Sequence, residues 1–287
     1  MIKSSHMQQR YACKFCQGGI DFDGIKTLRK VLQNDSDVYQ FGVFTGNGLK
    51  KLLQNLPKQT SGHFWGFDSF EGIPSESKEE QERWRLKNGK YMIHFLEGGY
   101  SAASVFKTKT IKDTVSKVER RIGFPDRLTL IPGFYSKVLN KDIIQKYNFK
   151  KAGYIDMDAD IYQSTIDSLY WMFQNDLITP GTIIRYDDWP RRNSSFGEFP
   201  NTNFYGQARA HDELMCIWDA SWKVCGKGMI QITKVGKKDC GDICQIIPTT
   251  RHELPLWFNR NCTSELLAGA RDRTMMSSLM NLQRDSF

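Results

Sequence analysis

Short apolar runs alternate with helical stretches over residues 33–235 of this 287-residue chain. The runs that predict strands lie at 38–44, 63–67, 128–132, 152–157 and 182–186, followed by two more extended pieces at 229–235 and 243–247. Apolar spacing predicts helices at 48–56, in a long stretch that ends near 121, and at 141–147, 164–175 and 207–218. This alternation predicts an α/β fold, in which a mostly parallel sheet carries helices on both faces.

The remaining segments predict additions to one domain. We see no internal repeat and no low-complexity linker, so residues 33–248 are expected to form a single domain. Residues 70–125 are far longer than a usual connection and predict a lid insertion. An N-terminal segment covers 1–32, where Ser5-His6-Met7 looks like a cloning scar. A C-terminal extension covers 249–287, and its expected helix at 264–282 could pack on the core or on a second subunit.

Composition narrows the class of protein. Apolar residues make up 40% of the chain and charged residues 25%, which excludes a disordered chain. No run approaches the roughly 18 apolar residues of a membrane helix, and the polar start MIKSSHMQQR lacks the apolar region of a signal peptide. The net charge of +8 favours anionic partners in general. The densest basic run, 107–121, has the spacing of an amphipathic helix, so we expect no nucleic-acid partner.

The cysteines indicate a reducing compartment. Their number, seven, is odd and they are spread over the whole length, which argues against a disulfide framework and for a cytoplasmic protein. Cys13 and Cys16 could begin a zinc site. Their candidate partners, Cys240 and Cys244, are too distant in sequence for a compact zinc ribbon, so no structural zinc is expected.

A glycine-rich turn, GVFTGNG at 42–48, follows the first predicted strand. Ligands of open α/β sheets bind at the carboxyl ends of strands, and a glycine lets the backbone approach a ligand closely. The turn reads GxxxGxG, which fits poorly with the GxGxxG pattern of dinucleotide sites. A binding role and a packing role both remain open at this point.

An acidic residue, Asp68, closes the second predicted strand. At that position a carboxylate can accept hydrogen bonds from both hydroxyls of a ribose bound over the first turn. Asp68-Ser69 before Glu71 also resembles a helix N-cap, which is the alternative. We favour the ribose role because the glycine turn lies beside it.

Carboxylates gather at the ends of the fourth and fifth predicted strands. Asp156, Asp158 and Asp160 close the fourth strand, and Asp187-Asp188 closes the fifth. Neighbouring strands lie about 4.8 Å apart, so these side chains can meet on one ion. Oxygen ligands favour a hard cation such as Mg²⁺, and so many carboxylates without a cation would repel one another. The sequence therefore predicts a Mg²⁺ site here.

These segments together resemble a known family. The resemblance covers about residues 38–214 and rests on FGVxxG at 41–46, GFDSFEGIP at 66–74, GFY at 133–135, DADIYQST at 158–165, DDW at 187–189 and AHDE at 210–213. In this order they resemble the macrocin O-methyltransferase (TylF-like) family. Its members depend on S-adenosylmethionine and Mg²⁺ and methylate sugar hydroxyls of natural products.

The resemblance implies a Rossmann-like class I methyltransferase fold with a seven-stranded sheet. It also implies residue roles. Metal ligation falls to Asp158, Asp187 and Asp188, with Asp160 nearby as a ligand or base. The cofactor-binding residues it implies are Gly42, Val43, Gly46, Gly48, Asp68, Ser69, Gly133, Phe134 and Asp158. Gln40 departs from the family, which usually has an acid there, and Tyr186 and the long loop 190–206 leave the acceptor open.

The expected chemistry is methyl transfer to a hydroxyl of a small-molecule acceptor. A divalent cation can lower the pKa of a bound water from about 15.7 to about 7, and a coordinated hydroxyl should respond similarly. We expect Asp160 to accept the proton, with His211 and His94 as alternative bases. Two rival hypotheses remain. One is a metal-dependent glycosyltransferase, because Asp156-x-Asp158 and Asp158-x-Asp160 both read as a DxD element; the other is a catalytically silent protein that binds S-adenosylmethionine.

Overall fold

The structure is a computed structural model that describes residues 36–55, 62–83, 96–188, 206–226 and 228–236. The strands are β1 (Asp37–Phe41), β2 (Phe64–Asp68), β3 (Leu128–Pro132), β4 (Ala152–Met157), β5 (Ile183–Tyr186), β6 (Ser221–Gly226) and β7 (Met229–Lys234). The helices are α2 (Asn47–Asn55), α3 (Lys78–Arg83), α4 (Ala102–Phe106), α5 (Ile111–Ile122), α6 (Tyr135–Val138), α7 (Lys141–Lys146), α8 (Tyr162–Gln174) and α9 (Gly206–Ile217), with a short 3-10 helix at Pro125–Arg127.

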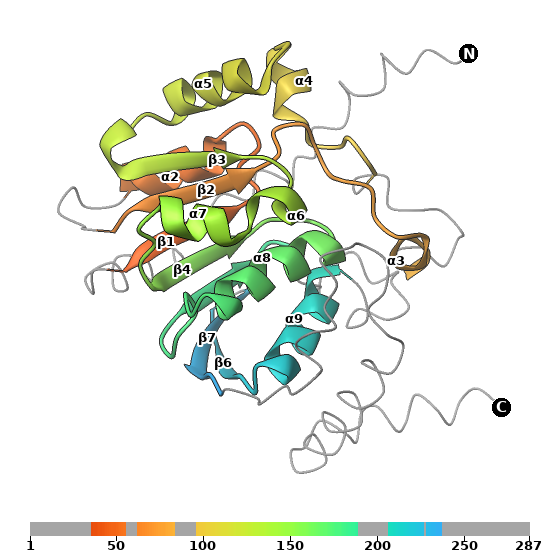
Figure 1. The fold of residues 1–287 in the computed structure, drawn as a ribbon, viewed down its shortest axis with the longest axis vertical. Coiled ribbons are helices and arrows are strands. Elements are labelled where there is room, and N and C mark those ends of the chain that lie inside the picture. Colours follow the sequence, from red (N-terminus) through yellow and green to blue (C-terminus); the bar gives the residue numbers. More distant parts are fainter. Residues whose placement is uncertain (1–35, 56–61, 84–95, 189–205, 227, 237–287) are drawn as a thin grey trace.

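The seven strands form one sheet in the order β3-β2-β1-β4-β5-β7-β6 (Figure 1). The pairs from β3 to β5 are parallel, and β7 runs antiparallel to both β5 and β6. This is the mostly parallel sheet with Rossmann-like topology that we expected from the sequence. The strand order reverses between β1 and β4, and ligands of such sheets bind outside the carboxyl ends of the strands at that reversal.

Helices cover both faces of the sheet (Figure 1). Successive residues of a strand point to opposite faces, so β1 contributes to two cores. Val38 packs with the leucines of α2 and with Val118 of α5, whereas Tyr39 and Phe41 pack in the cluster that contains Ile143 of α7 and residues of α8 and α9. Both faces of the sheet are therefore buried against helices, and the carboxyl ends of the strands are where a ligand site is expected.

The strands from β1 to β5 and β7 confirm the predicted ones; β3 and β4 have the predicted ends, and the others are shifted by one to three residues. The first ends at Phe41, three residues early, because residues 42–44 turn away from the sheet. The sequence analysis missed β6, whose exposed edge position lacks a buried apolar pattern: Val224 is 71% exposed. The extended piece expected at 243–247 lies outside the described residues, as do the N-terminal segment and the C-terminal extension.

Two segments of the expected lid insertion, 70–73 and 98–103, lie side by side. The N–H of Ile73 donates to the carbonyl of Gly99 (2.8 Å), that of Gly98 to Ile73 (2.9 Å), and that of Ala103 to Phe70 (2.9 Å). Within the insertion, the chain therefore departs after Ile73 and returns at Gly98 to the same point near the end of β2. Its described parts form α3, α4 and α5, the last of which confirms the amphipathic helix expected within 107–121.

Two further expectations concern the environment of the chain. Within the described ranges, no helix combines the length and apolar character that crossing a bilayer requires. Two of the seven cysteines lie in the described ranges: Cys216 in α9 is disulfide-bonded and Cys225 in β6 is free. One bond is not a disulfide framework, so the reducing compartment stays a prediction.

Candidate active site

A cavity opens at the carboxyl ends of β1 to β5, where the strand order reverses. Residues from the glycine turn, from the end of β2 and from the loops after β3, β4 and β5 line it. They are Gly42, Phe44, Asp68, Ser69, Gly72, Ile73, Pro74, Tyr100, Gly133, Phe134, Tyr135, Asp158, Ala159, Asp160, Ser164, Asp187 and Asp188. Most of the residues that the sequence analysis singled out therefore meet in one place.

The glycine turn is fixed by the backbone and by Asp68. Gly42 has φ +92°, and a Cβ there would lie 1.8 Å from the carbonyl oxygen of Asp158, so only glycine fits between β1 and β4. Gly46 has φ +81° and faces the side chain of Ile122 in α5, which gives it a packing role. Val43, Gly46 and Gly48 do not line the cavity, so Gly42 is the one of these four predicted cofactor-binding residues that reaches it.

Asp68 binds the backbone around it. Its Oδ2 accepts hydrogen bonds from the N–H groups of Val43 and Phe44, both at 2.7 Å, and its Oδ1 accepts one from Phe70 at 2.5 Å. Burial raises the pKa of Asp68, and these three N–H groups act in the opposite direction. A carboxylate offers about four acceptor positions, so Asp68 holds the turn and keeps capacity for a ligand.

Ser69 has a local role next to Asp68. Its hydroxyl donates to the carbonyl of Gly72 (2.7 Å) and accepts from the N–H groups of Glu71 (3.1 Å) and Gly72 (3.0 Å). These bonds form a tight turn, which no helix follows directly. The cap alternative was therefore correct in its chemistry but wrong about a helix at that point.

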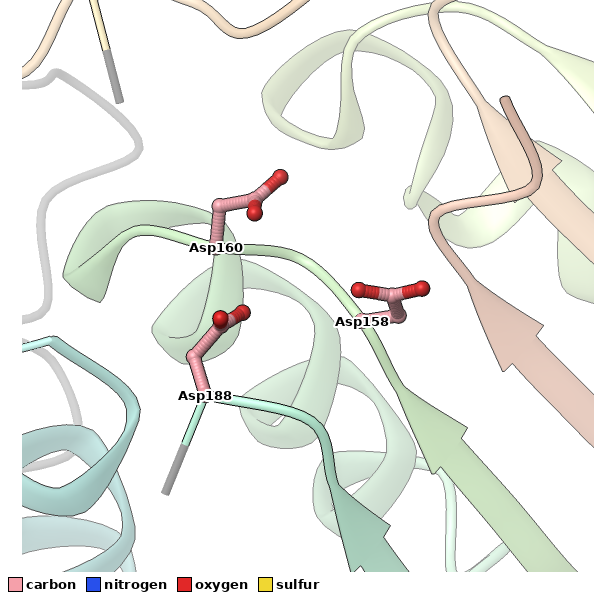
Figure 2. A group of neighbouring side chains, drawn as sticks. All are labelled: Asp158, Asp160 and Asp188. Carbon is pink, nitrogen blue, oxygen red and sulfur yellow. The ribbon is translucent and has the colours of Figure 1, made fainter. Parts of the chain in front are cut away.

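Three carboxylates converge on the other side of the cavity. Asp158 and Asp160 follow β4 and Asp188 follows β5, and each offers an oxygen within 4.8 Å of the oxygens of the other two. Figure 2 shows these side chains pointing toward a common space. Asp160 has φ +59°, a left-handed conformation that non-glycine residues adopt at a cost and that often marks functional sites.

The donor set suits a hard divalent cation. Burial, followed by the neighbouring carboxylates, raises the pKa of Asp158 and Asp160 well above the ordinary range, and burial and Asp187 raise that of Asp188 to about 8. The buried Oδ2 of Asp188 has no hydrogen-bond partner among the described residues. A cation would give that oxygen a partner and offset the repulsion, so these residues fit Mg²⁺.

Asp187 lines the cavity but is held in a separate ion pair. Its Oδ1 lies 2.5 Å from a guanidinium nitrogen of Arg185, whose other terminal nitrogen lies 2.7 Å from Oδ1 of Asp156. Gln40, Asp156 and Arg185 occupy one row across β1, β4 and β5, and Gln40 donates to Oδ2 of Asp156 (3.2 Å). The sequence analysis missed Arg185, because its pairing depends on the register between β4 and β5.

His211 does not line the cavity. It is fully buried, its Nδ1 lies 2.9 Å from the hydroxyl of Tyr186, and its ring packs edge-on against Trp222. Burial lowers its pKa to about 3, so the imidazole is neutral at pH 7. These features identify a core histidine, and the alternative base role for His211 is not supported. His94 lies outside the described residues.

Aromatic residues that the sequence analysis did not place in the site form part of the wall. Tyr100, from the end of the insertion, packs edge-on against Phe44 at 5.8 Å between ring centroids, and both line the cavity with the predicted Phe134. Tyr135 donates its hydroxyl to the carbonyl of Phe67 (3.2 Å). The cavity thus combines aromatic surface with an acidic side, which suits an organic ligand next to a cation.

The known proteins that the chain is similar to are solved structures of low sequence identity. No protein-family model and no curated protein matches the chain. The chain is similar to the solved structure of the O-methyltransferase NovP (TM-score 0.47, 17% identity, 74% of this chain and 80% of that chain covered). It is also similar to CalS11, a TDP-rhamnose 3'-O-methyltransferase of calicheamicin biosynthesis (0.43, 17%, 73% and 76%), and to the O-methyltransferase TomG from Streptomyces achromogenes in complex with SAM (0.40, 13%, 72% and 78%).

Proposed function

We propose that the chain is an S-adenosylmethionine-dependent O-methyltransferase that acts on a hydroxyl of a small molecule, such as a sugar or another natural product. One observation carries the proposal. A single cavity, at the strand-order reversal of a Rossmann-like sheet, has the glycine turn with Asp68 on one side and a group of carboxylates on the other.

The side of Gly42 and Asp68 is proposed to hold the cofactor. Asp68 closes β2 next to the turn after β1, which is where ribose hydroxyls are bound in sheets of this type. Gly133 and Phe134 follow β3 and line the same side. Since Phe44, Tyr100 and Phe134 offer aromatic surface there, a planar base has a wall to pack on.

The acidic side is proposed to hold a divalent cation. Asp158 and Asp188 belong to the converging group, and Asp187 is the third ligand that the family resemblance implies, with one oxygen held by Arg185. A bound divalent cation would lower the pKa of a hydroxyl that coordinates to it. Asp158 and Asp188 would orient that hydroxyl from two neighbouring strands, whose register fixes their separation.

Asp160 is proposed to accept the proton of the acceptor hydroxyl. A base must lie within hydrogen-bond reach of the oxygen that loses the proton. An oxygen of Asp160 lies within 4.8 Å of oxygens of Asp158 and Asp188, so it faces the place where that hydroxyl would sit. The same proximity would allow Asp160 to be a ligand. Metal affinity and the pH dependence of the rate in Asp160→Asn distinguish the two roles.

Calorimetry tests the proposal. The full-length chain should bind S-adenosylhomocysteine, and UDP or GDP should not bind, whereas a metal-dependent glycosyltransferase would show the reverse. Asp68→Ala should weaken S-adenosylhomocysteine binding strongly, and Asp188→Asn should weaken Mn²⁺ binding with little effect on S-adenosylhomocysteine. Asp126→Asn, an exposed carboxylate in the short 3-10 helix, is the matched control. Absence of S-adenosylhomocysteine binding in the parent would refute the methyltransferase assignment.

A further inference from the structure

A buried ionic network joins three helices beside the cavity. Glu80 of α3 is 2% exposed, and its carboxylate binds the guanidinium of Arg209 in α9. Arg209 also bonds through Nε to Glu213 (2.9 Å), and its guanidinium lies 4.3 Å from the ring centroid of Tyr162. The hydroxyl of Tyr162 donates to the other oxygen of Glu213. Because Tyr162 is the first residue of α8, the network ends at that helix terminus.

Glu76 of the insertion supplies a second connection to the same turn. Its Oε2 accepts a hydrogen bond from the N–H of Gln163 (3.1 Å) and its Oε1 accepts one from Ser77 (3.0 Å). The first turn of α8 has N–H groups without helical partners, and Ile161 at the N-cap provides no side-chain bond to them. A carboxylate at this position is also favoured by the helix dipole. The insertion therefore caps α8 from 87 residues away in the sequence.

The capped turn begins two residues after Asp160. Asp160 itself lies in a tight bend, where the N–H of Ile161 donates to the carbonyl of Ala159 (2.6 Å) and the backbone of Asp160 is left-handed. Ile161 is fully buried against Ile73 of the insertion, and Ile73 lines the cavity. A displacement of the first turn of α8 would therefore move the carboxylate of Asp160 and the adjacent cavity wall together.

We propose that Glu76 and Arg209 are positioning residues, which lock the insertion onto the first turn of α8 and so hold the loop 158–160, with the proposed ligand Asp158 and the proposed base Asp160, against Asp188. This inference rests on the proposed function, because the proposed function assigns a divalent cation to the carboxylate group. Glu76 acts through the N–H of Gln163, and Arg209 acts through Tyr162. Neither residue lines the cavity, so neither would touch the ligand or the cation.

The test compares two ligands in the full-length protein. Mn²⁺ binding, measured by electron paramagnetic resonance, reports on the carboxylate group, and S-adenosylhomocysteine calorimetry reports on the side of β1 and β2. Glu76→Ala should weaken Mn²⁺ binding about tenfold and leave S-adenosylhomocysteine binding within about twofold. Glu76→Gln keeps an oxygen that can accept from Gln163 and should restore Mn²⁺ binding to within about threefold. Glu97→Ala removes an exposed glutamate of the same insertion and should change neither affinity.

Arg209 needs a compensated variant, because its loss alone would leave the two buried glutamates Glu80 and Glu213 without their cationic partner. Glu80→Gln and Glu213→Gln together with Arg209→Met remove all three charges, should keep a cooperative thermal transition, and should also weaken Mn²⁺ binding about tenfold. If folded Glu76→Ala binds Mn²⁺ as the parent does, or if both ligands weaken equally, the positioning role is overturned while the proposed function stands. If the parent binds S-adenosylhomocysteine but no Mn²⁺, the cation site is refuted and this inference fails with it.

Discussion

The guanidinium of Arg185 forms an ion pair with Asp187 inside the candidate site, 2.5 Å between a terminal nitrogen and Oδ1. The same guanidinium binds Asp156 at 2.7 Å, so one buried cation pairs with a carboxylate inside β4 and with another directly after β5. Arg185 fixes one oxygen of Asp187 and offsets part of the negative charge that gathers at this edge of the sheet. The pair therefore helps the protein to keep its acidic group in place before any cation binds.

Arg185→Met should destabilise the fold. It would leave Asp156, 3% exposed, buried without its cationic partner, and removal of one partner of a buried ion pair costs about 3 to 5 kcal/mol. Urea unfolding measures this loss. Lys234→Met is the control, because Lys234 pairs with Asp219 at the surface and an exposed pair contributes about 1 kcal/mol or less. Equal losses in the two variants would show that Arg185 has no special role.

Gly42→Ala should displace the carboxylate group, because Gly42 follows β1, the strand next to β4. The new Cβ would lie 1.8 Å from the carbonyl oxygen of Asp158, so this peptide must move and Mn²⁺ affinity should fall at least tenfold. Gly181→Ala is the matched control: its φ is also positive (+102°), but a Cβ there meets nothing within 4 Å. It should cost only backbone strain, about 1 to 3 kcal/mol, with unchanged Mn²⁺ binding. Normal Mn²⁺ binding in Gly42→Ala would contradict this explanation of the glycine.

The order of the strands along the chain and the position of the carboxylates at the strand ends could be predicted from local sequence patterns. The apolar runs of β3 and β4 were predicted with their observed ends, and the carboxylates after β4 and β5 must meet because parallel strands end at the same edge. Asp158 and Asp188 could therefore be paired without a structure. The apolar pattern was weakest at β6, whose residues are exposed.

The supporting contacts could not be predicted in this way. Arg185 faces Asp156 only in the observed register of β4 and β5, and Glu80 meets Arg209 across 129 residues. His211 could be recognised as a core residue only after its burial and its contact with Tyr186 were known. Such contacts depend on how the elements pack, and a side chain in isolation does not reveal them.

The buried His211 should make the fold sensitive to acid. Its pKa is lowered to about 3, against about 6.5 when unfolded, so its neutral form stabilises the fold fully above pH 6.5. This stabilisation is lost as the pH falls from 6.5 toward 3, by roughly 3 to 5 kcal/mol in total. In His211→Gln the free energy of unfolding should fall less steeply between pH 7 and 4. His63→Gln, at a partly buried histidine, should show a smaller change. Parallel curves for parent and His211→Gln would refute the assignment.

The last prediction separates ligand from base at the end of β4. Asp158 follows the strand directly, so Asp158→Asn should weaken Mn²⁺ binding, and excess Mn²⁺ should restore much of the activity. If Asp160 accepts the proton, Asp160→Asn should keep Mn²⁺ and S-adenosylhomocysteine binding, yet lower the rate of methyl transfer by about 10² to 10⁴. It should also abolish the acid limb of the pH-rate profile, because that limb reports protonation of the base. The rate is measured with a radiolabelled methyl donor on an acceptor found by metabolite screening. Rescue of Asp160→Asn by added metal, with the pH profile of the parent, would instead make Asp160 a ligand.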